Sequence, residues 1–406
     1  MLSQSPITAT QMSLMPTDSR RWNQRGKKMK KSDPPPKGMY SLIFGPCTCA
    51  IKHSGAGEFG RDVLRRETIQ ITLVYLPWGL IWINTTVMDI FHSWGVEVAV
   101  HLQTQYGHYE GWFSLASTVA DLHTTFFCFF PVWFYLRRDV GVKLIWVAVI
   151  GDWLNLVMKW VLFGERPYWW VHDTRFYGKD PAPALKQFPI TCETGPGSPS
   201  GHAMGSAGVW YVMITAVFSV AAERRFPPIL YNFLQVGLWM LLCTVELLVC
   251  MSRVYMAAHF PHQVISGVIT GIMVAEVFSR VQWIYRASLK KYFYTTLFLL
   301  SFAVGFYELL KALGVDLLWT LEKAQKWCVR AEWVHMDSTP FASLLRNMGT
   351  LFGLGLGLHS PLYTESKKSS IPFRVGCITV SLLLLQVLDG LTFSSRDQAM
   401  FYVLSF

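Results

Sequence analysis

Residues 195–221, GPGSPSGHAMGSAGVWYVMITAVFSVA, join a Gly/Pro/Ser-rich turn directly to an uninterrupted apolar run. The run that begins at Ala203 supplies most of a membrane span, which takes about 20 apolar residues. The turn before it places unpaired backbone N–H groups and the positive end of a helix dipole at Ser200, Gly201 and His202. This stretch therefore predicts a membrane helix whose N-terminus binds an anion.

The polar residues of this turn each have a structural alternative. Ser200 is a good N-cap residue, and a hydroxyl there needs no further role. The alternative for His202 is an ordinary loop histidine with no role in chemistry. Beside an anion site, however, His202 stands where a general acid is needed.

Apolar runs of similar length recur along the chain of 406 residues. Hydrophobic residues make up 52% and charged residues only 15%, against about 25% in soluble domains. Because no long polar domain interrupts the runs, we predict an all-α polytopic membrane protein, a bundle of about nine transmembrane helices. The predicted spans are 69–87, 113–136, 143–163, 203–221, 229–250, 264–280, 292–312, 341–359 and 371–389.

The N-terminal residues differ from this body. Residues 1–66 hold twelve Lys/Arg and four Asp/Glu, which is +8 of the net charge of +10, and they show no periodic apolar face. We interpret 1–66 as a disordered basic extension beside a membrane and not as a nucleic-acid-binding segment. Residues 67–87 form an extra hydrophobic segment and a candidate transmembrane helix, and 88–406 form the transmembrane domain.

Loop charges predict which side of the membrane each loop faces. The basic loops are 137–143, 222–228, 280–291 and 360–374, and they alternate with the loops 164–202, 251–263 and 313–340. By the positive-inside rule the basic loops face the cytosol, and the others face the lumen or the exterior. Cys192 and Cys328 both fall on that second side, where disulfides form, so a bond between them is a hypothesis.

A second polar cluster contains Lys159 and Arg166. On one continuous helix a spacing of seven residues would return both side chains to the same face, and Pro167 predicts that the helix ends near Arg166. Two cations at a helix end suit a phosphate dianion. The alternative is that both residues anchor the span at the membrane interface.

A third cluster contains Arg253, His259 and His262. Arg253 is suited to clamp phosphate oxygens, and a histidine is suited to attack phosphorus, although spacing alone does not choose between His259 and His262. The sequence has no carboxylate cluster of the kind that Mg²⁺ or Ca²⁺ needs. The three clusters together fit phosphoryl transfer with neither metal nor other cofactor.

These clusters resemble a known signature. The motifs K-x6-RP from Lys159, PSGH from Pro199 and SR-x5-H from Ser252 are similar to those of the acid-phosphatase-like superfamily, which includes lipid phosphate phosphatases and vanadium haloperoxidases. Within it, residues 88–406 resemble the glucose-6-phosphatase catalytic subunits, in particular their liver-type, gluconeogenic branch, with the last span of the family cut short. Further matching stretches are GDWLNLV from Gly151, CETGPGSPSGH from Cys192 and WTLEKAQ from Trp319.

The resemblance implies hydrolysis of glucose 6-phosphate to glucose and phosphate, the final step of gluconeogenesis and glycogenolysis. It implies an endoplasmic reticulum membrane, a lumenal active site and functional coupling to a glucose 6-phosphate transporter. It also implies that His259 is the nucleophile that forms a phosphohistidine and that His202 is the proton donor. The implied phosphate-binding residues are Lys159, Arg166, Ser200, Gly201 and Arg253.

Some residues depart from the pattern or leave it open. Gln263 stands where the superfamily often has Asp, four residues after the nucleophilic histidine, and Gln can orient an imidazole without stabilising its charged form. We expect Tyr168, Trp169 and Trp170 to be membrane-interface residues and not sugar contacts. The alternative functions are a lipid phosphate phosphatase and a non-catalytic sugar-phosphate binding or transport protein.

Overall fold

The computed structural model describes residues 87–178, 181–334, 340–361 and 371–394. The chain divides into two units, Met1–Leu73 and Val74–Phe406, and all the described residues belong to the second. Every regular element among them is helical, which confirms the predicted class. The predicted extension 1–66, and the segment 67–87 apart from its last residue, lie outside the described residues and stay predictions.

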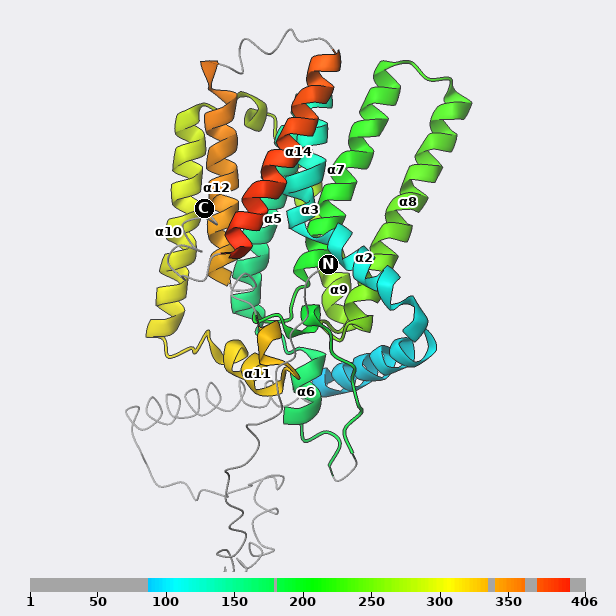
Figure 1. The fold of residues 1–406 in the computed structure, drawn as a ribbon, viewed down its shortest axis with the longest axis vertical. Helices are drawn as coiled ribbons and strands as arrows, with labels where there is room; N and C mark the ends of the chain where they lie inside the picture. The colour runs from blue at the N-terminus through cyan, green and yellow to red at the C-terminus, as the bar shows by residue number, and fades with distance from the viewer. Residues whose placement is uncertain (1–86, 179–180, 335–339, 362–370, 395–406) are drawn as a thin grey trace, which may run out of the picture. The chain divides into compact units, whose positions relative to one another are not determined.

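The elements follow one another with few long connections (Figure 1). A first helix covers residues 87–105. The next elements are η1 (Gly107–Tyr109), α2 (Glu110–Ala120), α3 (Leu122–Thr124), the π-helical turn η2 (Thr125–Phe129), α4 (Phe130–Leu136), α5 (Arg138–Leu162) and α6 (Pro167–Asp173). They are followed by η3 (Pro189–Cys192), α7 (Gly201–Glu223), α8 (Pro228–Tyr255), α9 (Pro261–Arg280), η4 (Trp283–Arg286), α10 (Leu289–Ala312), α11 (Trp319–Trp327), η5 (Ala331–Trp333), α12 (Pro340–Leu358) and α14 (Ile371–Ser394).

Long apolar helices make this a multi-pass membrane protein. In the described part, five segments are long and apolar enough to cross a bilayer, and a pair bent by 56°, Gly107–Ala120 and Leu122–Leu136, adds a sixth if it counts as one span. The five segments are Arg138–Asp173, α7, α8, α9 and α10. The predicted spans 341–359 and 371–389 fall on α12 and α14, and the count of nine remains a prediction.

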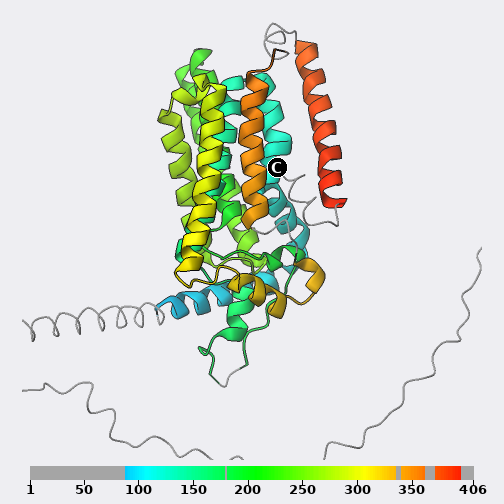
Figure 2. The ribbon, with the colours of Figure 1, turned by 90° about the vertical axis from the view of Figure 1, so that its left-hand side faces the viewer.

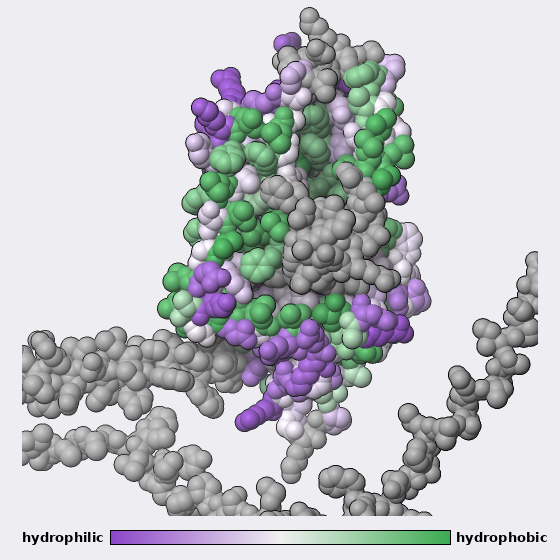
Figure 3. Space-filling model, turned by 60° about the vertical axis from the view of Figure 1, so that its left-hand side comes forward, coloured by the Kyte–Doolittle hydropathy of each residue, from purple (hydrophilic) through white to green (hydrophobic). Residues whose placement is uncertain are grey.

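The outer faces of these helices are apolar. On α8, Ile229 and Phe233 are 86% and 80% exposed, which suits contact with lipid better than with water. Figure 3 shows hydrophobic side chains over the middle of the helices and hydrophilic ones towards both ends. This banding agrees with a bilayer around the helices.

Two glycines let α9 approach α7 closely. A Cβ on Gly267 would lie 2.7 Å from the carbonyl oxygen of Ser200, and one on Gly271 would overlap that of Met204. Small residues at such crossings allow membrane helices to pack backbone to backbone. The contact fixes the N-terminal turn of α7 against α9.

The loops gather at two ends of the helices, as the charge pattern predicts. At one end, Arg137 before α5 pairs with Glu223 at the end of α7, with Nη1 and Oε2 2.8 Å apart. At the other end, Arg166 donates to the carbonyl oxygen of Gly195 over 2.7 Å. Figures 1 and 2 show α6 and α11 at this second end, beside the loop that leads into α7.

Candidate active site

Arg166 reaches the site from a loop and not from a helix face. α5 ends at Leu162, and Phe163 has a left-handed backbone with a φ of 46°, so the prediction of one helix face shared by Lys159 and Arg166 is wrong. Arg166 is instead the N-cap residue of α6 and is fully buried. Its Nε donates to the carbonyl oxygen of Gly195, and Arg166 lines the same cavity as Lys159.

Lys159 and the start of α7 line the same cavity. A Cβ on Gly195 would lie 3.8 Å from Lys159 Nζ, and one on Gly201 would lie 4.0 Å from it. Ser200 occupies the N-cap position of α7, but its side chain makes no capping hydrogen bond. Its buried Oγ has no hydrogen-bond partner among the described residues. The first turn of α7 therefore keeps its anion-binding groups available.

Arg253 enters the site from the last turn of α8. Its side chain is fully buried, and its Nη1 donates to Ser117 Oγ over 2.9 Å. Its Nη2 donates to a carboxylate oxygen of Glu193. The Ser117 hydroxyl on α2 thus orients the Arg253 guanidinium so that Nη2 faces Glu193.

His259 follows in the loop between α8 and α9 and is also fully buried. Its Nδ1 lies 2.8 Å from the carbonyl oxygen of Gly197. Because a carbonyl only accepts, Nδ1 carries the proton and Nε2 keeps its lone pair. Nε2 lies 3.5 Å from Arg166 Nη1, inside the cationic cluster.

His262 lies in a different environment. Its ring stacks on Phe260 with centroids 5.7 Å apart, and on His92 with centroids 5.5 Å apart. The structure therefore separates two histidines that spacing left equivalent. Only His259 joins the cluster with Arg166.

Gln263 supports the loop and does not orient the His259 ring. Its Oε1 accepts from the backbone N–H of Phe260 over 3.1 Å, and its Nε2 donates to the carbonyl oxygen of Glu165 over 2.7 Å. These bonds cap α9 and tie it to the loop that carries the Arg166 backbone. The Gly197 carbonyl takes the orienting position that the sequence suggested for Gln263.

Glu193 is the main site residue that the sequence analysis missed. Its Oε2 lies 3.0 Å from Arg166 Nη1, and its Oε1 accepts from Arg253. The same two oxygens lie 3.8 Å from His259 Nε2 and from His202 Nδ1 respectively. A carboxylate at the centre of two guanidinium groups and two imidazoles stands where phosphoryl oxygens would bind. Its one sequence signal is a lone acid beside a Gly/Pro loop.

The charges around this carboxylate set its protonation and that of the imidazole beside it. Burial alone raises the pKa of Glu193, but Arg253 and Arg166 outweigh burial and hold that pKa well below its ordinary value. Burial, together with Arg166 and Arg253, holds the pKa of His259 well below 6.5. At neutral pH the site therefore contains a carboxylate anion and an uncharged imidazole with a free lone pair.

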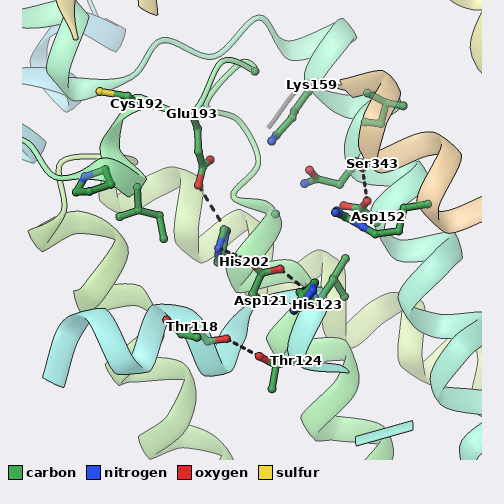
Figure 4. A pocket seen from close by; sticks show the side chains of 18 of the residues that line it. Thr118, Asp121, His123, Thr124, Asp152, Lys159, Cys192, Glu193, His202 and Ser343 are labelled. Atoms are coloured by element: carbon green, nitrogen blue, oxygen red, sulfur yellow. Dashed lines mark hydrogen bonds and ion pairs between the residues drawn. The ribbon is translucent and has the colours of Figure 1, made fainter. Parts of the chain in front are cut away.

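His202 lies in the first turn of α7, across the carboxylate from His259. Its Nε2 is 3.8 Å from Asp121 Oδ2 (Figure 4). Asp121, between α2 and α3, also accepts from the backbone N–H of His123 over 3.0 Å. Asp121 could not be predicted from the sequence because it belongs to none of the three motifs. His202 therefore lies between two carboxylates, Asp121 at Nε2 and Glu193 at Nδ1.

Three aromatic residues of α6 lie elsewhere than expected. Tyr168, Trp169 and Trp170 are 0%, 0% and 5% exposed, so the prediction that they form a membrane-interface belt is wrong. They pack with Phe260 and with Val96 of the first helix, because α6 folds back under the loop before α9. None of the three lines the cavity.

A disulfide joins Cys192 to Cys328, with Cα atoms 5.8 Å apart, which confirms the hypothesis from the loop pattern. Cys192 ends η3 and directly precedes Glu193. Cys328 directly follows α11. The bond therefore holds the segment that carries the central carboxylate against α11.

Sequence comparison agrees with this geometry. A profile of the PAP2 superfamily matches residues 140–287, which contain all seven predicted site residues. Glucose-6-phosphatase catalytic subunit 1 of Haplochromis nubilus is 73% identical over 321 residues, which is 79% of this chain and 91% of that protein. The chain belongs to the glucose-6-phosphatase family.

Other members of the glucose-6-phosphatase family match with similar coverage. Catalytic subunit 1 of Felis catus is 59% identical over 79% of this chain and 90% of its own length. Glucose-6-phosphatase 2 of Homo sapiens is 49% identical over 79% of this chain and 92% of its own length. No solved structure matches the chain. The resemblance drawn from the motifs is thereby confirmed at the level of the family.

Proposed function

We propose that this protein is a phosphoric monoester hydrolase that converts glucose 6-phosphate to glucose and phosphate through a phosphohistidine intermediate. The observation that carries the proposal is the Glu193 carboxylate, held by Arg166 and Arg253 between two histidines. Relatives of high identity are named for this reaction. The charges of the cluster support binding of a phosphate group, and the names of the relatives support glucose as the sugar that carries it.

The phosphate group takes the place of the Glu193 carboxylate. Arg166 and Arg253 hold its oxygens, and Lys159 adds a third cation from α5. Ser200 and the backbone N–H groups from Gly201 onward bind the oxygen that faces α7. Cations and helix N–H groups aimed at the equatorial oxygens stabilise the charge of the transition state.

The two histidines act on opposite sides of the phosphorus. His259 Nε2 attacks with its lone pair, the bond from phosphorus to the sugar oxygen breaks, and His202 gives its proton to the leaving alkoxide. Water then attacks the phosphohistidine and gives a proton back to His202. The bond from phosphorus to His259 breaks and phosphate leaves. A neutral His259 and a His202 paired with Asp121 suit these two roles.

The location and pathway form part of the same proposal. The cluster belongs to the loops opposite the basic ones, so the positive-inside rule favours a lumenal or exterior site. For an enzyme of this family we propose the endoplasmic reticulum membrane, with the site in the lumen. Substrate made in the cytosol then needs a glucose 6-phosphate transporter, and the reaction is the last step of gluconeogenesis and glycogenolysis.

A single-turnover labelling experiment tests the proposal. The detergent-solubilised full chain is mixed with ³²P-labelled glucose 6-phosphate and quenched under conditions that preserve phosphohistidine. We expect label on the wild type and on His262→Ala, the matched control, and no label on His259→Ala. Label that persists on His259→Ala and disappears on His262→Ala would overturn the assigned nucleophile.

Substrate choice is tested separately. We expect higher kcat/KM on glucose 6-phosphate than on phosphatidic acid, measured on the same wild-type preparation. A preference for the lipid would show a lipid phosphate phosphatase instead. Binding of glucose 6-phosphate with no release of phosphate would show a non-catalytic binding protein.

A further inference from the structure

The cavity that contains the phosphate cluster continues well beyond it. Its volume is about 520 Å³, within the range of roughly 300–1,000 Å³ typical of small-molecule sites. Beyond His202 and Lys159 the lining still includes charged and polar side chains, which a phosphate group alone does not require. The polar residues of this extension include Asp121, Asp152, Asn155, Ser343 and Arg346.

One face of α5 runs from the phosphate end to the far end of this cavity. Asp152, Asn155 and Lys159 are spaced by three and four residues, so their side chains share a face. All three line the cavity. At about 1.5 Å per residue, Asp152 lies roughly 10.5 Å along the axis from Lys159. A ligand bound by Lys159 at its phosphate end therefore meets Asn155 and Asp152 with its other end.

Helix α12 fixes the Asp152 carboxylate. Its Oδ2 accepts from Ser343 Oγ over 2.6 Å (Figure 4). The same oxygen accepts from Asn347 Nδ2, also over 2.6 Å. Both donors converge on the same oxygen, which leaves the acceptor capacity of Oδ1 for another partner. A carboxylate held in this way is prepared to accept hydrogen bonds from hydroxyl groups.

Arg346 adds donors to the same part of the cavity. It lies one turn along α12 from Ser343 and lines the cavity with it. Its Nε is buried and has no hydrogen-bond partner among the described residues. A guanidinium beside a carboxylate offers donors and acceptors together, which is the combination that neighbouring hydroxyl groups of a sugar satisfy.

We infer that Asp152, Asn155, Ser343 and Arg346 form a polyol subsite that binds the hydroxyl groups of the sugar ring. This inference rests on the proposed function, because it takes the phosphate end of the substrate to lie at Lys159. Ionisable groups within membrane helices are costly and are kept where they face a cavity or a partner. Here the recognition is polar, and the aromatic residues of α6 take no part in it.

The test compares two substrates on the solubilised full chain. One is glucose 6-phosphate, and the other is p-nitrophenyl phosphate, which has a phosphate group but no sugar hydroxyls. For Asp152→Asn we expect the ratio of kcat/KM for the sugar ester to that for the nitrophenyl ester to fall about ten- to hundredfold, the usual effect of a hydrogen bond to a charged group. Asp139→Asn, on the same helix outside the cavity, is the matched control and leaves this ratio unchanged.

Ser343→Ala gives an independent measurement if Asp152→Asn fails to fold. It removes one hydroxyl from α12 and is expected to lower the same ratio by a smaller factor. Equal loss on both substrates would overturn the subsite and assign Asp152 to helix packing alone. If the wild type hydrolyses the nitrophenyl ester but not glucose 6-phosphate, the proposed function fails instead.

Discussion

Replacing Glu193 by Gln is expected to tighten the binding of inorganic phosphate. In the free protein the carboxylate pairs with Arg166 at 3.0 Å and also pairs with Arg253. An incoming phosphate dianion has to displace this carboxylate or bind beside a like charge. Gln keeps the size of the side chain and one acceptor oxygen, but it removes the charge. The competition for the two guanidinium groups is therefore weaker in the variant.

The size of the expected change in phosphate affinity follows from these two ion pairs. At the 3.0 Å separation of Arg166 Nη1 and Glu193 Oε2, and an effective dielectric constant of about 20, two unit charges attract by roughly 5.5 kcal/mol before desolvation. The net value of a hydrogen bond to a charged group is about 1.5–3 kcal/mol, because both partners lose water. Removing one such competitor should lower the dissociation constant of phosphate about ten- to hundredfold.

Product inhibition measures this effect directly. The inhibition constant of inorganic phosphate is determined for the wild type, for Glu193→Gln and for Glu110→Gln. Glu110 is a matched control because it pairs with Lys186 at the surface, outside the cavity. We expect a lower constant in Glu193→Gln only. Weaker phosphate binding in that variant would refute the reasoning, since the carboxylate would then serve to orient the two arginines and not to compete with substrate.

Two further predictions concern the framework. Cys192 and Cys328 are 136 residues apart, so their disulfide removes about 5 kcal/mol of chain entropy from the unfolded state. The double Cys→Ser variant should therefore lose heat stability and activity. The control Cys243→Ser, at a free thiol, should lose neither. A thermal inactivation curve equal to that of wild type would contradict this. Gly271→Ala forces α9 away from α7 and should lower Tm and kcat/KM together, while Gly237→Ala, with open space around it, should leave both unchanged.

Part of the fold could be predicted from the sequence because membrane spans are local features. The run after His202 is apolar over its whole length and follows a turn, so the start of α7 was predicted within two residues. The predicted span 143–163 ends within one residue of α5, but the expectation from Pro167 that the helix continues to near Arg166 is wrong, because Phe163 adopts a left-handed backbone that no residue type in the stretch requires. The length of a span is set by the bilayer, but the residue at which it stops is set by tertiary contacts.

The same distinction applies to the site. The seven predicted site residues come from three motifs in which each residue type by itself indicates a chemical role. Glu193 and Asp121 act through partners that are distant in sequence, since Glu193 lies 60 residues from Arg253 and Asp121 lies between α2 and α3 whereas His202 lies in α7. No periodicity links such positions. The burial of Tyr168 was missed for the same reason, because it depends on where α6 folds back.

The central carboxylate also explains how such a site persists without substrate. The side chains of Arg166 and Arg253 are both fully buried. Their like charges repel each other there, which is unfavourable unless an anion lies between them. Glu193 supplies that anion in the free protein, and the phosphate group supplies it in the complex. The exchange of one anion for another leaves the two guanidinium groups in place. The arginines are therefore positioned before substrate arrives, and the transition state finds its donors already oriented.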